Sequence, residues 1–318
     1  MSSHLRSRLA DLPPALARHP HLKSLAWILG HAPTGGRQAY LAVVARNLIL
    51  GHALDEALGC LLDAGVPVQP LKGALFIETL YGGELGARPM SDLDLLVPAG
   101  SAARARAALL RLGYEDTGAG RARFTARYTH HDVLRRGPVP VELHHRLCHD
   151  LAVDGDSAVF FRDQVNVKWR SGHLAVACPE LQLFYILLHA ATHALRYSPV
   201  WVVDAVLQVC AAPRVSWEVI EHEARQRRAF RLLHAAARYV NDYFPGTFPR
   251  ALPPRSLRDV LLTAALGHDD TPIPYGPGAR SLVVRALLTD RRTDAVRVIA
   301  EKAWLRLIEV GERATAGA

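Results

Sequence analysis

Lysine is scarce in this chain of 318 residues. Only four of its 38 basic residues are lysines, and arginine supplies the rest of a net charge of +8. Together with abundant Ala, Leu, Val, Gly and Pro, this skew is typical of a GC-rich coding sequence. The positive charge is therefore weak evidence for nucleic-acid binding, DNA included, although it suits anionic ligands.

Cysteine is also scarce, and long apolar runs are absent from the sequence. The four cysteines form no C-x-x-C pair, which argues against a cysteine-rich zinc site and a dense disulfide scaffold. The most apolar stretch, residues 181–195, contains His189 and His193 and is too short to span a bilayer. No apolar signal segment follows the first arginines. We expect a cytoplasmic protein with no membrane partner.

The composition is that of a globular chain, with 50% hydrophobic and 21% charged residues. Hydrophobic periodicity and turn residues divide it into three predicted regions. These are an N-terminal helical region (1–64), an α/β core (65–177) and a C-terminal helical domain (178–318). Strands are predicted at 66–71, 92–97, 123–134 and 139–143, and core helices at 74–81 and 102–112. Further helices are predicted at 181–195, 201–209, 217–230, 232–243, 257–266 and 294–310. The predicted fold class is α+β, a small mixed sheet between helical flanks.

Acidic residues on two of the predicted strands carry the chemistry. Asp92 and Asp94 are two residues apart, so they share one face of a strand while Leu93 and Leu95 face the core. Two adjacent carboxylates repel each other unless a cation neutralises them, and Mg²⁺ is the natural candidate. Glu142 on a neighbouring strand would complete a set for two metal ions and a triphosphate. The alternative is that all three are loop or surface residues.

A basic turn precedes these acids. Lys72 and Gly73 end one strand and open a helix, where backbone N–H groups and a lysine charge suit an anion. The alternatives are a surface lysine and an ordinary glycine turn. His144 lies on the same strand face as Glu142, and it suits either the active site or a hydrogen bond to a backbone carbonyl.

In this order, the residues resemble a known family. A Lys72-Gly73 turn, a helix ending near Tyr81, Arg88 before the D-L-D-L-L-V strand, and Val141-Glu142-Leu143-His144 are similar to the uncharacterised bacterial nucleotidyltransferase-like proteins. These belong to the polymerase-β-type nucleotidyltransferase superfamily. The resemblance covers residues 60–150 well and 179–204 more loosely. One departure is Gly73-Ala74, where that superfamily has Gly-Gly or Gly-Ser.

The resemblance implies a metal-dependent nucleotidyltransferase core at 65–177. A nucleoside monophosphate would pass from a nucleoside triphosphate to an acceptor, for which a small molecule, a peptide, a protein and RNA are the open alternatives. The cofactor would be Mg²⁺, with two ions expected and Mn²⁺ as a substitute. The implied catalytic residues and metal ligands are Asp92, Asp94 and Glu142. The implied nucleotide-binding residues are Lys72, Gly73, Arg88 and His144.

Placement expectations follow from these roles. The carboxylates of Asp92, Asp94 and Glu142 should lie within about 4–7 Å of one another, as two-metal sites require. Neither Lys72 nor Arg88 is expected in the core. The alternative for Arg88 is an ion pair with Glu84 in the glycine-rich loop.

Two other functions remain open. One is a non-catalytic nucleotide-binding or protein-interaction module of the same fold. The other is a zinc hydrolase that uses His189, His193 and Asp204. The glutamate of the H-E-x-x-H motif is missing from this segment, and histidines buried in the core are the simpler interpretation. The His130-His131 and His144-His145 pairs form a histidine-rich patch, but their spacing matches no structural zinc motif.

Overall fold

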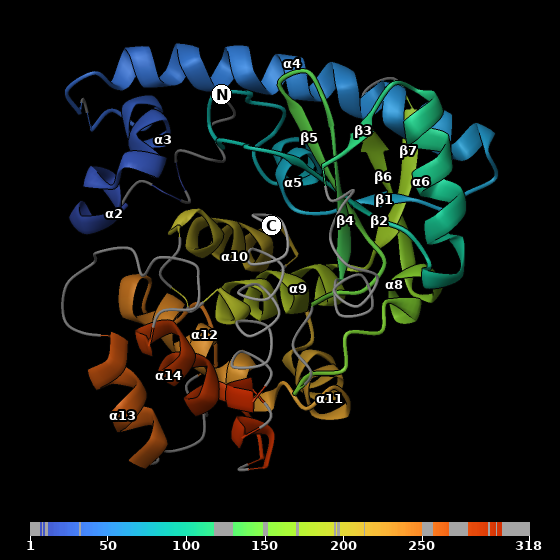
Figure 1. The fold of residues 1–318 in the computed structure, drawn as a ribbon. Coiled ribbons are helices and arrows are strands. Elements are labelled where there is room, and N and C mark those ends of the chain that lie inside the picture. Colours follow the sequence, from blue (N-terminus) through green and yellow to red (C-terminus); the bar gives the residue numbers. More distant parts are fainter. Residues whose placement is uncertain are drawn as a thin grey trace, which may run out of the picture. The chain divides into compact units, whose positions relative to one another are not determined.

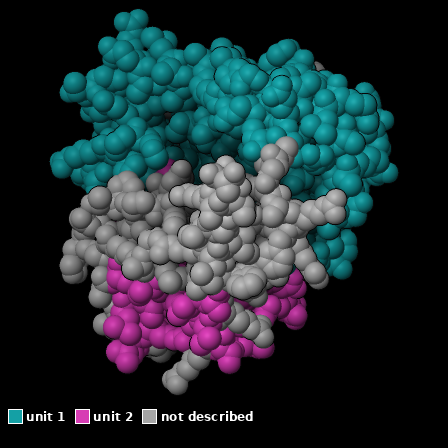
Figure 2. Space-filling view, viewed as in Figure 1, with its two compact units in different colours: residues 1–149, 155–186, 199–215 teal, residues 150–154, 187–198, 216–318 magenta. Residues whose placement is uncertain are grey.

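The computed structural model describes most of the chain: residues 7, 9, 12–31, 33–117, 130–148, 152–169, 172–193, 195, 198–212, 214–249, 257–266, 279–291, 293–296 and 298–300. The chain forms two compact units, which are coloured separately in Figure 2. Unit 1 contains residues 1–149, 155–186 and 199–215, and unit 2 contains 150–154, 187–198 and 216–318. Every predicted metal ligand and nucleotide-binding residue belongs to unit 1.

A five-stranded mixed sheet forms the centre of unit 1 (Figure 1). Its order is β1-β2-β5-β4-β3, and only the central β2–β5 pair is parallel. The strands are β1 (Gln69–Pro70), β2 (Leu93–Leu96), β3 (Glu115–Asp116), β4 (His131–Arg136) and β5 (Val139–His144). The sheet and the surrounding helices confirm the predicted α+β fold class.

One face of the sheet is apolar and is covered by two helices, α4 (Gly36–Asp63) and α6 (Ala102–Arg111). Alternate strand residues such as Leu93, Leu95 and Leu143 are at most 2% exposed and pack against these helices. The intervening residues therefore lie on the opposite face. This alternation places the acids and His144 together, away from the main core.

Helix α4 also holds the loop that leads into β2. The Asn47 amide donates hydrogen bonds to the carbonyl oxygens of Leu85 and Arg88, both at 2.7 Å. Arg46, one residue earlier, donates to Ser91 O at 2.7 Å and to Pro138 O at 2.8 Å. Because Ser91 and Pro138 precede β2 and β5, Arg46 joins the starts of the two central strands.

The remaining α-helices and strands described in unit 1 are two N-terminal helices, one helix between β1 and β2, and the elements that follow β5. Helices α2 (Pro14–Arg18) and α3 (Lys23–Ile28) precede α4, and α5 (Gly73–Thr79) follows β1. The short helix α8 (Ala158–Arg162) precedes a hairpin of β6 (Gln164–Trp169) and β7 (Gly172–Ala177). Helix α9 (Pro179–Thr192) begins in unit 1 and ends in unit 2, and α10 (Val200–Ala211) belongs to unit 1.

Unit 2 is helical where it is described. It contains α11 (Trp217–Gln226), α12 (Phe230–Tyr243), α13 (Leu257–Leu266) and α14 (Ala279–Leu288). The Asp290 carboxylate accepts hydrogen bonds from the backbone N–H groups of Phe230 and Arg231, which satisfies free donors at the start of α12. Among the described residues, no helix is both long and apolar enough to cross a membrane.

Most predicted elements are present, within a few residues at their ends. The β6–β7 hairpin, α8 and α14 were not predicted. No residue of β6 is buried, and even Val165 is exposed, so this strand lacks the alternation of buried and exposed residues that identifies a half-buried strand. The predicted strand at 123–134 lies largely outside the described residues, and only its end appears, as the start of β4. The predicted helix at 294–310 also extends beyond them, and the three-region division stays a prediction.

Asn47 should be important for stability. The Asn47→Asp variant keeps the side-chain size but removes both amide donors from a residue that is 1% exposed. It leaves two buried carbonyls without these partners, so we expect unfolding in urea to show a loss of about 2–4 kcal/mol. Gln38→Ala, at an exposed position of the same helix, should change stability by less than about 0.5 kcal/mol. Equal effects of the two substitutions would contradict the anchoring role.

Candidate active site

The parallel pairing of β2 with β5 brings the predicted acids together. Asp94 and Glu142 are direct partners in the register, and both lie on the face away from the main core. One side-chain ligand atom each from Asp94, Glu142 and His144 lies within 4.8 Å of the others. Asp94 is only 7% exposed. The structure therefore assembles two carboxylates and an imidazole in a largely desolvated group.

Asp92 stands one residue before β2, beside this group. Burial, followed by repulsion from the Asp94 carboxylate, raises the pKa of Asp92 to about 6, although Lys72 opposes the shift. Repulsion from Glu142 adds to the rise. Asp92 therefore senses both of the other acids, as expected for three carboxylates that share one site.

Lys72 lies at the corner between β1 and α5, facing Asp94. Its Nζ is 3.1 Å from Asp94 Oδ1, and its side chain is 14% exposed. Burial by itself would raise the pKa of Asp94, but the Lys72 charge and the His144 hydrogen bond lower it below its usual range. Lys72 is thus neither a solvated surface residue nor fully buried.

The Lys72 backbone is strained. Its φ of 46° and ψ of −132° lie in a region that glycine adopts readily and that costs other residues about 1–3 kcal/mol. At the next residue, Gly73, a Cβ would lie 3.0 Å from Met90 Sδ, so the Met90 side chain would have to shift slightly to admit a larger residue. A lysine at a position that favours glycine indicates that the contacts of its side chain compensate for the free-energy cost of the strained backbone.

His144 connects the two acids. Its Nε2 lies 3.0 Å from Asp94 Oδ1 and 3.3 Å from Glu142 Oε2, and the residue is 1% exposed. Burial lowers the pKa of His144, but hydrogen bonds to the two carboxylates outweigh this and raise it above its ordinary value. The partners of Nε2 are therefore the two carboxylates and not a backbone carbonyl, which was the alternative. Whether His144 also binds nucleotide stays a prediction.

Arg88 is placed differently from the expectation that it lies outside the core. The residue is 9% exposed, and its Nε and Nη2 donate to the Asp204 carboxylate of α10 at 2.8–3.1 Å. Tyr81 donates a further hydrogen bond to Asp204 at 2.8 Å. That expectation was wrong, as was the alternative pairing with Glu84, because the partner lies 116 residues away in sequence. A nucleotide-binding role for Arg88 stays a prediction.

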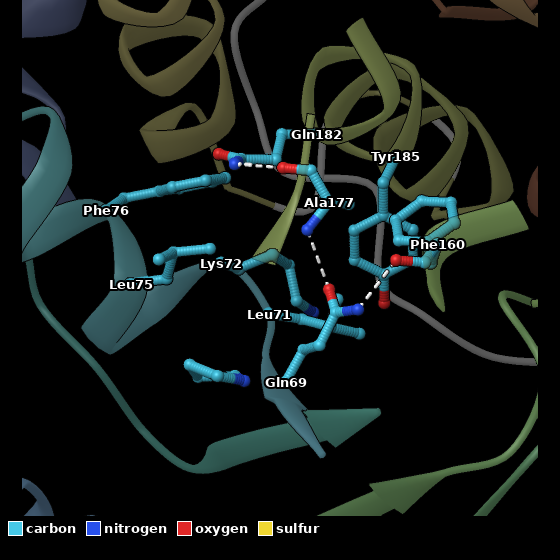
Figure 3. A pocket seen from close by; sticks show the side chains of 10 residues that line it. Gln69, Leu71, Lys72, Leu75, Phe76, Phe160, Ala177, Gln182 and Tyr185 are labelled. Carbon is cyan, nitrogen blue, oxygen red and sulfur yellow. Dashed lines mark hydrogen bonds between the residues drawn. The ribbon is translucent and has the colours of Figure 1, made fainter. Parts of the chain in front are cut away.

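A small pocket lies behind the Lys72 corner (Figure 3). Lys72, Phe160 and Tyr185 line it, and the Lys72 Nζ lies 5.8 Å from the centre of the Tyr185 ring. The Gln69 amide donates to Phe160 O at 2.7 Å and accepts from the Ala177 N–H at 2.8 Å. The Gln69 amide thus joins β1 to α8 and β7 beside this pocket.

The sequence indicates a histidine-rich patch but does not predict which of its members lie together. His131 on β4 pairs with His144 on β5 in the antiparallel register. His130, His131 and His144 each offer a ring nitrogen, and these three atoms lie within 4.8 Å of one another. The sequence contains both histidine pairs, but only cross-strand pairing brings them together. Motif spacing along the chain carries no such signal.

The residues of the proposed zinc hydrolase do not form such a group. The ring centres of His189 and His193 are 4.2 Å apart. His189 lies in the last turn of α9, and His193 directly follows the helix. Asp204 is engaged with Arg88 and Tyr81. Within the described part of the chain, no metal-ligand group contains His189, His193 or Asp204.

Removing one partner of the buried Arg88–Asp204 ion pair should destabilise the fold. Arg88→Met would leave the Asp204 charge buried, so urea unfolding should show a loss of about 3–5 kcal/mol. Arg106→Met, which breaks the more exposed pair with Asp116, should cost less than about 1 kcal/mol. The double variant Arg88→Met/Asp204→Leu should recover much of the loss, since no unpaired buried charge remains. A loss for Arg88→Met no larger than for Arg106→Met would contradict the pairing.

The strain at Lys72 can be measured with two substitutions. Lys72→Gly and Lys72→Ala both remove the amine, so their difference isolates the backbone. We expect the glycine variant to be about 1 kcal/mol more stable in urea unfolding, because glycine tolerates the positive φ. At exposed Ala107 in helix α6 the order should reverse, with Ala107→Gly less stable by about 1 kcal/mol. Equal stability of the two Lys72 variants would show that the corner is relaxed.

Comparison with known proteins agrees with this arrangement. Residues 15–245 match a family described as uncharacterised nucleotidyltransferase. No curated protein and no solved structure shows a significant match. The matched range exceeds half of the chain and includes every residue of the site from Lys72 to His144, along with Arg88 and Asp204. The chain therefore belongs to this nucleotidyltransferase family, whose general reaction class is nucleotidyl transfer.

Proposed function

We propose that this protein transfers a nucleoside monophosphate from a nucleoside triphosphate to an acceptor, with divalent cations held by Asp92, Asp94 and Glu142. The observation that carries the proposal is the β2–β5 register, which makes Asp94 and Glu142 direct neighbours in a largely buried site. Family membership supplies the reaction class. The acceptor, whether a small molecule, peptide, protein or RNA, is left to experiment.

The donor set fits a hard divalent cation. Carboxylate oxygens are the ligands that Mg²⁺ prefers, and Mn²⁺ accepts the same oxygens together with an imidazole nitrogen. Asp92 supports the fit, because repulsion from Asp94 contributes to its raised pKa and a cation would relieve it. When bound, such cations neutralise the triphosphate and lower the pKa of the attacking hydroxyl.

The protein's own groups would orient the reactants. Lys72, which now faces Asp94 at 3.1 Å, is positioned to shift its charge toward a phosphate that arrives beside the acids. His144 is a positioning residue in this proposal, because it is buried and fixes both Asp94 and Glu142 through Nε2. Arg88 acts at a distance: its pairing with Asp204 secures the chain four residues before Asp92.

The alternative of a non-catalytic nucleotide-binding module has one specific observation in its favour. The Asp94 charge already has two partners within hydrogen-bonding distance, Lys72 and His144. A site that is neutralised internally needs no metal to be stable. The two functions differ in whether bound nucleotide is consumed.

Substitutions of the acids should separate these functions. With Mg²⁺, each of the four nucleoside triphosphates would be tested by calorimetry, and transfer would be followed with labelled nucleotide and a cell extract. Asp92→Asn and Glu142→Gln should abolish the Mg²⁺ dependence of binding. They should also lower transfer by about 100-fold or more, since several kcal/mol of charge stabilisation in the transition state are lost.

Glu115→Gln is the matched control, because Glu115 is an exposed acid on β3 of the same sheet. It should leave binding and transfer unchanged. Mg²⁺-dependent binding without transfer of any nucleotide would favour the non-catalytic module. Wild-type binding by both acid variants, with unchanged melting temperatures, would show that the carboxylates are not metal ligands.

A further inference from the structure

Three histidines meet at the edge of the acidic site. His131 Nδ1 lies 2.9 Å from His130 Nε2, and the ring centres of both residues lie 5.0–5.3 Å from that of His144. The three candidate ligand nitrogens lie within 4.8 Å of one another. His130 and His131 are half-buried, whereas His144 is 1% exposed. Three imidazoles in one partly desolvated place are uncommon without a function, because burying polar groups costs free energy.

A second observation concerns His144. Its Nε2 faces Asp94 and Glu142, but its buried Nδ1 has no hydrogen-bond partner within the described part of the chain. Buried polar atoms are normally satisfied, and one that is not calls for an explanation such as an ion. The imidazole can therefore hydrogen-bond to the two carboxylates through Nε2 while Nδ1 is available to bind an ion.

The ligand chemistry differs from that of the acids. Imidazole nitrogens favour Zn²⁺ and related transition-metal ions, whereas Mg²⁺ favours oxygen. Two nitrogens bound to a tetrahedral zinc ion at about 2.0–2.1 Å would lie about 3.3 Å apart. The 2.9 Å contact between His130 and His131 needs to open by only a few tenths of an ångström to reach this spacing.

We propose that His130, His131 and His144 form a binding site for a nitrogen-preferring divalent cation of the Zn²⁺ type, next to the carboxylates. The site goes beyond the proposed transfer reaction and does not depend on it. Its fourth ligand would be water, because the Glu142 carboxylate lies at the other ring nitrogen of His144, 3.3 Å from Nε2. The simpler rival is a mutual hydrogen bond between His130 and His131 with no ion.

The test uses the full-length protein, stripped of metal with a chelator. Zn²⁺ would be added in the presence of a large excess of Mg²⁺, and bound zinc would be counted by elemental analysis after dialysis. Co²⁺ would be titrated in parallel, because its visible absorption reports nitrogen coordination. Wild-type protein should retain one equivalent of Zn²⁺. His131→Gln and His130→Gln should each weaken binding at least about tenfold.

His145→Gln is the matched control, since it removes a neighbouring histidine that belongs to no metal-ligand group among the described residues. It should retain the wild-type affinity. The proposal is overturned if wild-type protein binds no Zn²⁺ under excess Mg²⁺, or if His145→Gln weakens binding as much as His131→Gln does. Circular dichroism would establish that each variant is folded. If His131→Gln does not fold, His130→Gln provides the test of the histidine site.

Nucleotide binding measured on the same samples separates the two proposals. Mg²⁺-dependent triphosphate binding without bound Zn²⁺ would reject the histidine site alone. Retained Zn²⁺ without any triphosphate binding would reject the proposed function and support the histidine site.

Discussion

The parallel pairing of β2 with β5 is the constraint on which the rest of the site depends. It makes Asp94 and Glu142 neighbours on the face of the sheet away from the main core. Two carboxylates held there repel each other and are poorly solvated, so other groups must compensate their charge. Lys72 and His144 supply this compensation from two sides. The strained Lys72 backbone follows from the same need, because the amine has to reach Asp94 from a tight corner.

The surrounding structure holds this charged group in place. Asn47 and Arg46 on α4 bind the chain just before β2, and Arg46 also binds the chain just before β5. The buried Arg88–Asp204 pair ties the same loop to α10. A buried ion pair adds little net stability but disfavours alternative placements of its loop strongly, since separation leaves unpaired charge. Its role is therefore better understood as fixing the position of Asp92 than as strengthening the fold.

Local patterns predicted the parts of this site that depend on nearby residues. Alternation along β2 and β5 was enough to place Asp94, Glu142 and His144 on one face, because the strand period is two. The partner of Arg88 and the meeting of His130 and His131 with His144 depend on long-range pairing, which spacing in the sequence does not encode. The β6–β7 hairpin was missed for a related reason: its first strand is largely exposed, so it lacks the apolar alternation that identifies half-buried strands.

His144 ties the two halves of the site into one electrostatic unit. Its Nε2 contacts both carboxylates, while its ring lies against those of His130 and His131. Because this ring is buried, a change in charge on one side acts on the other side with less screening than it would have in solvent. An oxygen-rich site and a nitrogen-rich site that share such a ring would differ in metal preference yet depend on each other. If both sites bind ions, their preferences would follow from the ligand atoms: the carboxylates of β2 and β5 offer oxygen, whereas His144 on β5, His131 on β4 and the residue before β4 offer nitrogen.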